Sequence, residues 1–327
     1  MKKFTVCLPL LVFLLVSGAA AFSGQTFEIN HASHVQSGSN ENRVSEMFKK
    51  LVEERSKGAI VVKNFPDAVF GTEMENLGQI KSGEIEMTVL GIVGPQQMVP
   101  EYDATSLPFA FPTIEAVEEY WSGPLGVKIR ELMLQRNNAV LLGLLRRGPR
   151  NLTANKAIAS PSDLSGLKLR IPEVATWVTI WKSMGALPTP VNWSEVYTSL
   201  QAGIVDAHEN PIETTYIGKI NEVQSHLMLT EHLYLHFFYI MNNKFYENLP
   251  ADYQILIVDA LKEATDWGNK IGEQEEQEIL KKMEKDGLTV VRVDKQMFMQ
   301  AAMDGILEAA NTLTPEAREV VVRLLNK

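Results

Sequence analysis

Two segments in the last third of the chain are longer than the elements of an ordinary single domain. Residues 227–242 are rich in strand-forming side chains and about twice the length of a typical strand. Residues 251–286 contain no proline and predict one helix about 54 Å long at 1.5 Å per residue. Both lengths are explained if a long strand and a long helix cross between two lobes. We therefore expect a ligand cleft at the lobe boundary.

The rest of the chain alternates strand and helix patterns. Strands are expected at residues 26–31, 59–65 and 85–91, with helices between them at residues 40–57 and 72–82. This βαβαβ order predicts a parallel sheet covered by helices. The remaining expected elements are strands at residues 138–145, 167–171 and 204–207, and helices at residues 175–184 and 194–201. The predicted fold class is therefore α/β with two lobes.

The N-terminus has the order of a secretory signal peptide. Two lysines precede an apolar run over residues 4–16, and the small residues behind it end in an A-x-A pattern. We expect cleavage near Ala21, which makes residues 1–21 the signal peptide and the mature protein soluble and periplasmic. The alternative is a membrane anchor, but the run is short and no second hydrophobic segment follows it. Cleavage also removes Cys7, the only cysteine, so we expect no thiol and no disulfide.

Charge and motifs argue against several classes of function. The formal net charge is −9, and no stripe of lysine or arginine occurs, so nucleic acid is not an expected partner. The sequence lacks G-x-S-x-G, Walker, G-x-G-x-x-G and H-E-x-x-H motifs. Two histidine pairs, His31 with His34 and His232 with His236, have metal-like spacing, yet packed or surface histidines are the simpler interpretation. We expect no metal, no other cofactor and no catalytic residues.

Four arginines near the expected lobe boundary are the most informative polar residues. Arg146, Arg147 and Arg150 surround a Gly-Pro pair, and Arg170 closes the apolar strand LKLRIP. An arginine at a strand end can direct its planar fork into a cleft, where it matches a carboxylate bidentately. On spacing alone, an ordinary surface or ion-pair arginine is the favoured interpretation for each of them. The run His-Glu-Asn-Pro at residues 208–211 indicates by itself only a turn.

Several segments together resemble the solute-binding proteins of TRAP transporters, the DctP-type family. The segments are GLKLRIP at residues 166–172, PTPVNWSEVYTSLQAGIVDAHENP at 188–211, FPDAVFGTEMENLGQIKSGEIEMT at 65–88 and RGPRNLTANKAI at 147–158. The resemblance spans nearly all of the mature chain. It implies a receptor with a two-lobed periplasmic-binding-protein architecture, crossed by a long strand and a long hinge-spanning helix. Its cleft would close on an organic acid, and its partners would be TRAP membrane subunits.

The resemblance also implies how the chain divides. The N-terminal lobe is expected to contain residues 22–147 and 236–275, and the C-terminal lobe residues 148–235 and 276–327. We expect a monomer that captures ligand without chemical change.

Three residues should hold the ligand carboxylate if the family roles carry over. Arg170 is implied to form the principal salt bridge, and Arg150 to assist it. Asn210, in the E-N-P setting, is implied to bond the same carboxylate or an adjacent hydroxyl.

Four further residues are implied to contact the body of the ligand. Trp193 would lie against it, while Glu73, His34 and Glu173 would reach its hydroxyl groups. Core packing for Trp193 and a helix N-terminal charge for Glu73 remain the alternatives. Gly91 occupies a position at which some sialate-binding relatives carry a glutamate, which argues against sialic acid.

These residues favour a particular class of ligand. Carboxylates opposite Arg170 would repel a second ligand carboxylate and accept hydroxyls, so a sugar acid such as a hexuronate or aldonate is expected. A C4-dicarboxylate or a 2-oxo acid is the alternative within the family. Two other classes of function remain. One is a secreted hydrolase or lyase that uses Glu73 or Glu173 with His34, and the other is a sensory module that presents ligand to a receptor kinase.

Overall fold

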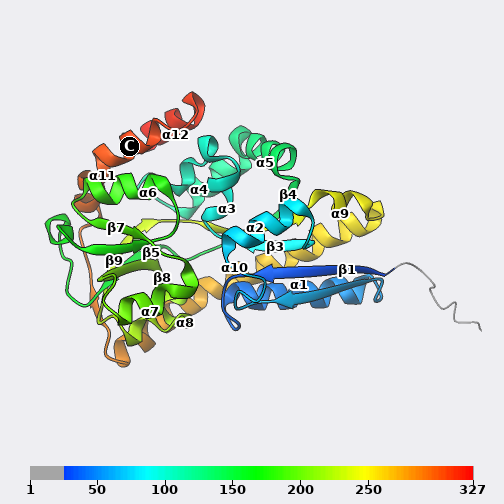
Figure 1. Ribbon diagram of the computed structural model, residues 1–327, viewed down its shortest axis with the longest axis horizontal. Coiled ribbons are helices and arrows are strands. Elements are labelled where there is room, and N and C mark those ends of the chain that lie inside the picture. The colour runs from blue at the N-terminus through cyan, green and yellow to red at the C-terminus, as the bar shows by residue number, and fades with distance from the viewer. Residues whose placement is uncertain (1–25, 327) are drawn as a thin grey trace, which may run out of the picture.

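The computed structural model describes residues 26–326, which form two α/β lobes as predicted (Figure 1). The first sheet has the order β2-β1-β3-β10-β4 and contains β1 (Phe27–Ser33), β2 (Ile60–Phe65), β3 (Met87–Leu90), β4 (Ala139–Arg146) and β10 (His236–Asn242). The second has the order β11-β9-β5-β8-β6-β7 and contains β5 (Arg150–Ala154), β6 (Lys168–Ile171), β7 (Leu187–Pro190), β8 (Ala207–Pro211), β9 (His226–Leu233) and β11 (Thr289–Val291). The expected signal peptide, residues 1–21, lies outside the described residues.

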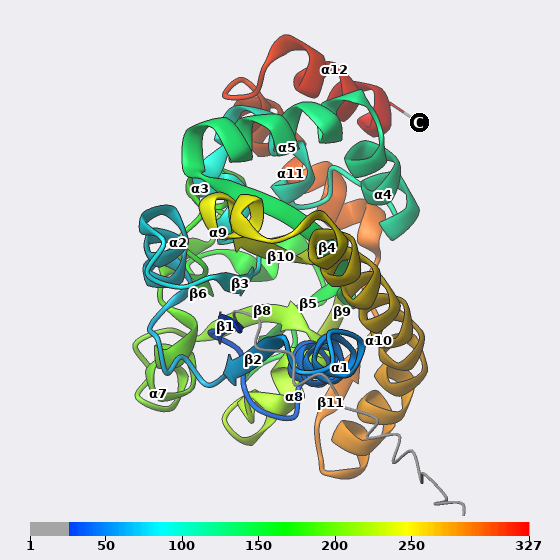
Figure 2. The ribbon, with the colours of Figure 1, turned by 90° about the vertical axis from the view of Figure 1, so that its right-hand side faces the viewer.

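Helices cover both sheets. Those on or beside the first sheet are α1 (Asn40–Arg55), α2 (Glu73–Ser82), α3 (Val93–Met98), α4 (Ile114–Ser122), α5 (Pro124–Asn137) and α9 (Asn243–Asn248). Those on or beside the second are α6 (Ala175–Ser183), α7 (Val196–Gln201), α8 (Ile212–Ile217), α11 (Lys295–Ala310) and α12 (Pro315–Leu325). The long helix α10 (Ala251–Lys285) runs past both sheets (Figure 2). Within residues 26–326, no helix is long and apolar enough to cross a membrane.

Capping residues set the helix boundaries of the βαβαβ unit. The Ser39 side chain accepts a hydrogen bond from Asn42 N at the start of α1. Thr72 and Glu75 form a capping box at the start of α2, and Gly83 ends that helix with φ of 80°. Strand β1 pairs in parallel with both β2 and β3. The carboxyl ends of β1 and β3 therefore meet at one edge, which faces the second lobe.

The predicted crossing at residues 227–242 is made by two strands and not by one. Strand β9 pairs with β5 and β11 in the second sheet, and β10 pairs with β3 and β4 in the first. The chain leaves extended pairing at Tyr234 and Leu235, because the two halves must reach different partner strands. His232 and His236 consequently lie on separate strands rather than on one shared face.

The chain also passes between the two sheets at a second point. Strand β4 belongs to the first sheet and β5 to the second, and residues 147–149 connect them. A Cβ on Gly148 would lie 2.7 Å from Glu276 Oε1 on α10, so glycine permits this connection to pass close to the helix. The chain thus crosses between the lobes at the β4–β5 connection, at the β9–β10 connection and along α10.

Residues 208–211, expected as a turn, are instead strand β8. This strand pairs antiparallel with β5, so that Asn210 lies opposite Asn151 and Glu209 lies opposite Leu152. The pairing sets Arg150 and Glu209 beside each other, although 59 residues separate them in the sequence.

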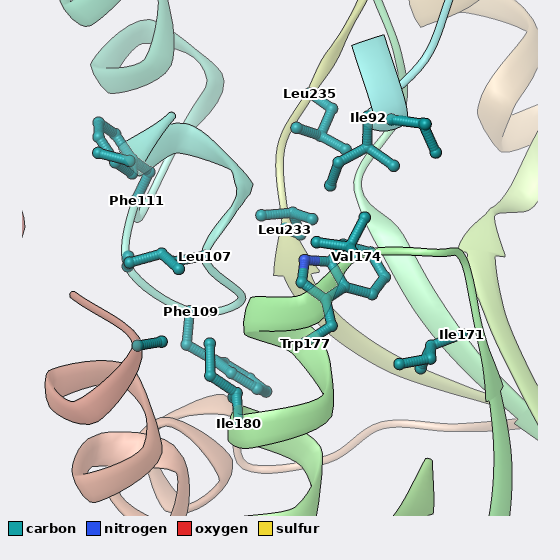
Figure 3. Packing of buried hydrophobic residues seen from close by; sticks show 14 of the residues in the cluster. Ile92, Leu107, Phe109, Phe111, Ile171, Val174, Trp177, Ile180, Leu233 and Leu235 are labelled. Atoms are coloured by element: carbon teal, nitrogen blue, oxygen red, sulfur yellow. The ribbon is translucent and has the colours of Figure 1, made fainter. Parts of the chain in front are cut away.

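The largest apolar core joins α6 to the loop that follows α3. Trp177 is fully buried, and its Nε1 donates a hydrogen bond to Ser106 O at 2.6 Å. Phe109 lies against the same helix near Ile180, and its backbone N–H donates to His232 O (Figure 3). The same core includes Leu169 and Ile171 of β6 and Met228 and Leu233 of β9.

Candidate functional site

Two adjoining cavities between the lobes form one cleft. Both are lined by His34, Glu73, Arg170, Pro172 and Trp193. The structure brings to this cleft all seven residues that the resemblance implies as ligand contacts, namely Arg170, Arg150, Asn210, Glu73, Trp193, His34 and Glu173. Parallel strands of each lobe end here, so the cleft receives side chains from both sheets.

Arg170 carries a buried positive charge without an acidic partner. It is the third residue of β6 and is only 3% exposed. Its Nε and Nη2 donate to Val191 O at 2.9 and 2.6 Å, and no carboxylate of the described chain lies within ion-pair distance. Burial lowers the pKa of Arg170 to about 10, so the guanidinium is still charged at neutral pH. A buried unpaired cation of this kind favours a bound anion.

Arg150 differs, because its charge is already balanced by Glu209. Arg150 Nε lies 2.5 Å from Glu209 Oε2, and Arg150 Nη2 lies 2.7 Å from Oε1. His232 Nε2 lies 3.2 Å from the same Oε2. Burial opposes ionisation of Glu209, but Arg150 and His232 hold its pKa at about 2. Arg150 can therefore offer the ligand a hydrogen-bond donor but not a free charge.

Asn210 is oriented by two neighbours at the floor of the cleft. Its Oδ1 accepts from Arg147 Nη2 at 3.3 Å, and its Nδ2 contacts His208 Nε2 at 3.0 Å. Burial lowers the pKa of His208 well below its usual value, so the ring is neutral and can accept from the amide. The second N–H of Asn210 remains for the ligand.

Arg147 is a cleft residue that the sequence analysis did not select. Its guanidinium carbon lies 4.2 Å from the centre of the Phe237 ring, and its Nη2 also donates to Thr214 Oγ1 at 3.1 Å. No carboxylate of residues 26–326 lies within ion-pair distance of it. Burial and the neighbouring Arg150 lower its pKa to about 9. Its place at the lobe boundary was a signal, but the motif drew attention to Arg150 instead.

His34 and Glu73 face each other on the first-lobe side. His34 follows β1, Glu73 is the first residue of α2, and His34 Nε2 lies 3.6 Å from Glu73 Oε2. Glu73 Oε1 and His34 Nδ1 are buried and have no hydrogen-bond partner in the part of the chain that the structure describes. Burial lowers the pKa of His34 although Glu73 opposes the shift, so the ring is neutral at pH 7. Buried polar atoms normally find partners, so these two are suited to a ligand's polar groups.

Trp193 closes the cleft from the second lobe. It begins a short 3₁₀ helix (Trp193–Glu195), and its Nε1 donates to Gln36 Oε1 of the first lobe at 3.1 Å. Its ring packs beside His208 at 5.9 Å and over Gly218. Glu173 lies exposed at the mouth. Trp193 is therefore both a wall of the cleft and a contact between the lobes.

Comparison with known proteins identifies a family. Residues 31–312 match the DctP family, described as bacterial extracellular solute-binding protein, family 7. A solute-binding protein of Roseobacter denitrificans is 31% identical over 316 residues, which cover 97% of this chain and 95% of that protein. The C4-dicarboxylate-binding periplasmic protein DctP of Rhodobacter capsulatus is 32% identical over 74% of this chain and 73% of its own length.

Solved structures agree with this assignment. A TRAP periplasmic solute-binding protein of Roseobacter denitrificans with bound L-galactonate has a TM-score of 0.86 and 29% identity, covering 92% of this chain and 99% of that one. A Sulfitobacter protein with bound β-D-galacturonate has a TM-score of 0.86 and 26% identity, covering 92% and 100%. A Shewanella oneidensis protein with bound succinate has a TM-score of 0.86 and 27% identity at the same coverage. The chain therefore belongs to the DctP family of TRAP-transporter solute-binding proteins, and it is a periplasmic receptor for small organic acids and not an enzyme.

Proposed function

We propose that this receptor captures a hydroxylated monocarboxylate, a sugar acid of the hexuronate or aldonate type. The observation that carries the proposal is the charge of the cleft. Arg147, Arg150 and Arg170 reach it, against the carboxylates of Glu73 and Glu209. Glu173 is left out of this count because it is exposed to solvent at the mouth of the cleft. With His34 neutral, one positive charge then remains inside the cleft, so a monoanion balances it. A dianion would leave an uncompensated negative charge in a buried space, which is costly.

The uncharged part of the ligand is supported by the first-lobe residues. Glu73 Oε1 needs a hydrogen-bond donor, and His34 Nδ1 is also without a partner. A polyol supplies donors and acceptors on neighbouring carbons, whereas an aliphatic dicarboxylate supplies only acceptors. Two of the similar structures carry L-galactonate and galacturonate.

A C4-dicarboxylate is the second candidate. Arg147 favours a dicarboxylate, because its guanidinium is a second buried cation in addition to Arg170. Neither arginine has an acidic partner among the described residues. Two similar proteins are consistent with this candidate. The Rhodobacter relative is named a C4-dicarboxylate-binding protein, and the Shewanella structure contains bound succinate. Glu73 stands against this reading, because it would face the second carboxylate of such a ligand.

The binding step follows from the side chains of the two lobes. Arg170 and Asn210 from the second lobe hold the carboxylate, while Glu73 and His34 from the first lobe hold hydroxyl groups. A ligand that contacts both sides stabilises the closed form by the contacts made only there. The proposed moving units are residues 22–147 with 236–275 and residues 148–235 with 276–327. We further propose that a monomer, freed of residues 1–21, delivers the ligand to TRAP membrane subunits.

Isothermal titration calorimetry on the mature protein tests this proposal. The ligands are L-galactonate, D-galacturonate and D-glucuronate, with succinate and 2-oxoglutarate as rivals and neutral D-galactose as the control. We expect a dissociation constant of about 1 µM or lower for a sugar acid, which corresponds to about 8 kcal/mol. Succinate should bind at least ten times more weakly, and galactose should give no heat. Tighter binding of succinate than of every sugar acid would refute the proposal.

A further inference from the structure

The space above Gly91 lies between an unpaired donor and an unpaired acceptor. Gly91 follows β3, and a Cβ at this position would lie 3.5 Å from Arg147 Nη1. The same Cβ would lie 3.6 Å from Glu73 Oε1 and 3.7 Å from Glu73 Oε2. The glycine therefore leaves open a small volume that faces a guanidinium on one side and a carboxylate on the other.

Both groups have hydrogen-bonding capacity left. The Nη2 of Arg147 is used by Asn210 and Thr214, whereas its Nη1 donates to no protein group in the described chain. Among residues 26–326, buried Glu73 Oε1 has no hydrogen-bond partner and no arginine nitrogen within 4 Å. The two groups thus address the same volume without satisfying each other.

Among the polar groups of a sugar acid, the hydroxyl is the one that fits both. A hydroxyl can accept from Arg147 and donate to Glu73 at the same time. A carboxylate would be attracted by Arg147 but repelled by Glu73, and an ammonium group would meet the reverse conflict.

We propose that Arg147, Glu73 and Gly91 form a subsite that recognises one hydroxyl group of the ligand. The inference rests on the proposed function and adds to it the residues that distinguish a hydroxylated acid from its deoxy analogue. Arg147 also connects the subsite to the carboxylate site, since the same guanidinium holds the amide of Asn210.

The subsite is held rigidly before ligand arrives. Glu73 starts α2 directly behind the Thr72 capping box, which fixes the first turn of the helix. Arg147 is stacked on Phe237 and bonded to Thr214. Groups that need little ordering on binding contribute more of their interaction energy to affinity and specificity.

Calorimetry with deoxy analogues tests the subsite. Wild type, Gly91→Ala and Arg147→Met are titrated with L-galactonate, D-galacturonate and D-glucuronate, and with the monodeoxy analogues of each acid that binds. Gly91 is not among the residues with positive φ, so alanine is compatible with its backbone, and its Cβ would make ordinary contacts. Arg146→Met is the matched control, because exposed Arg146 pairs with Glu118 outside the cleft.

One hydroxyl should stand out. In wild type, removing that hydroxyl should weaken binding about tenfold or more, as expected for bonds to charged groups. Gly91→Ala should also weaken binding of the parent acid about tenfold or more. Its affinity for the analogue that lacks this hydroxyl should stay within threefold of the wild-type affinity for the same analogue, because the alanine methyl group fills the space that the hydroxyl leaves. Arg147→Met should bind the parent acid more weakly and should prefer it over that analogue by a smaller factor than wild type does, because only the bond to Glu73 remains. Arg146→Met should behave as wild type.

The outcomes separate the two proposals. The subsite alone would be overturned if each monodeoxy analogue bound less than threefold more weakly than its parent sugar acid. It would also be overturned if Gly91→Ala left the affinity for the sugar acid unchanged. Failure of wild type to bind any of the three acids would overturn the proposed function, and the subsite with it.

Discussion

Replacing Arg170 by lysine separates charge from shape at the centre of the cleft. The arginine spends one N–H of Nε and one of Nη2 on Val191 O. Its remaining N–H groups, both on Nη1 and one on Nη2, are free to meet the two oxygens of a carboxylate. A lysine ammonium keeps the charge, but one nitrogen must serve both Val191 O and the ligand. It therefore cannot reproduce the bidentate contact.

The expected losses follow from the number of bonds removed. Each charge-assisted hydrogen bond contributes about 1.5–3 kcal/mol. Arg170→Lys loses one such bond and should weaken binding about 10- to 150-fold. Arg170→Ala loses both bonds and the charge, and should weaken it at least 100-fold.

Calorimetry with the sugar acid that binds wild type most tightly measures both variants. Arg292→Lys provides the control, since Arg292 is exposed and does not line the cleft. Thermal unfolding of each variant shows whether the protein is still folded. Affinity of Arg170→Lys within threefold of wild type would refute the bidentate geometry. Unchanged affinity of Arg170→Ala would refute the carboxylate site itself.

Three other perturbations probe different parts of the structure. Glu209→Gln leaves the buried charge of Arg150 unbalanced, so it should lower the free energy of unfolding by about 3–5 kcal/mol. Urea denaturation measures this change, and a loss of less than about 1 kcal/mol would contradict the pairing of Arg150 with Glu209. Burial raises the pKa of Glu41 to about 8, so its contribution to stability is complete below about pH 4.5 and is lost as pH rises through 8. Melting temperatures should therefore fall less between pH 5 and 8 in Glu41→Gln, and an identical slope would count against this assignment. Trp193→Phe removes the hydrogen bond between the Trp193 indole and Gln36, which joins the two lobes. The rate constant for ligand release, measured by stopped-flow, should therefore rise about three- to tenfold. An unchanged rate constant would mean that this contact does not hold the lobes together.

Local signals predicted the elements, and segment length predicted the crossing. The caps at Ser39 and Thr72 and the glycine at position 83 are visible in the sequence, and the helices begin and end there. The excess length of residues 227–242 revealed a passage between lobes. It could not reveal the break at Tyr234 and Leu235, because that depends on which strands pair on each side.

The state of each arginine could not be read from the sequence. Arg150 and Arg147 are three positions apart in one motif, yet the first is neutralised by Glu209 and the second is not. The difference arises from the antiparallel pairing of β5 with β8, which is a contact between distant segments. The motifs led to seven residues that line the cleft, whereas the place of Arg147 in it and the charge state of each arginine required the three-dimensional arrangement.

The interleaved order of the strands also constrains biosynthesis. Strand β10 fills the place between β3 and β4, and β9 the place between β5 and β11, so neither sheet is complete until the chain has been made beyond residue 242. Contacts over such long sequence separations form slowly. Neither native sheet can therefore be completed while the first two thirds of the chain are being synthesised.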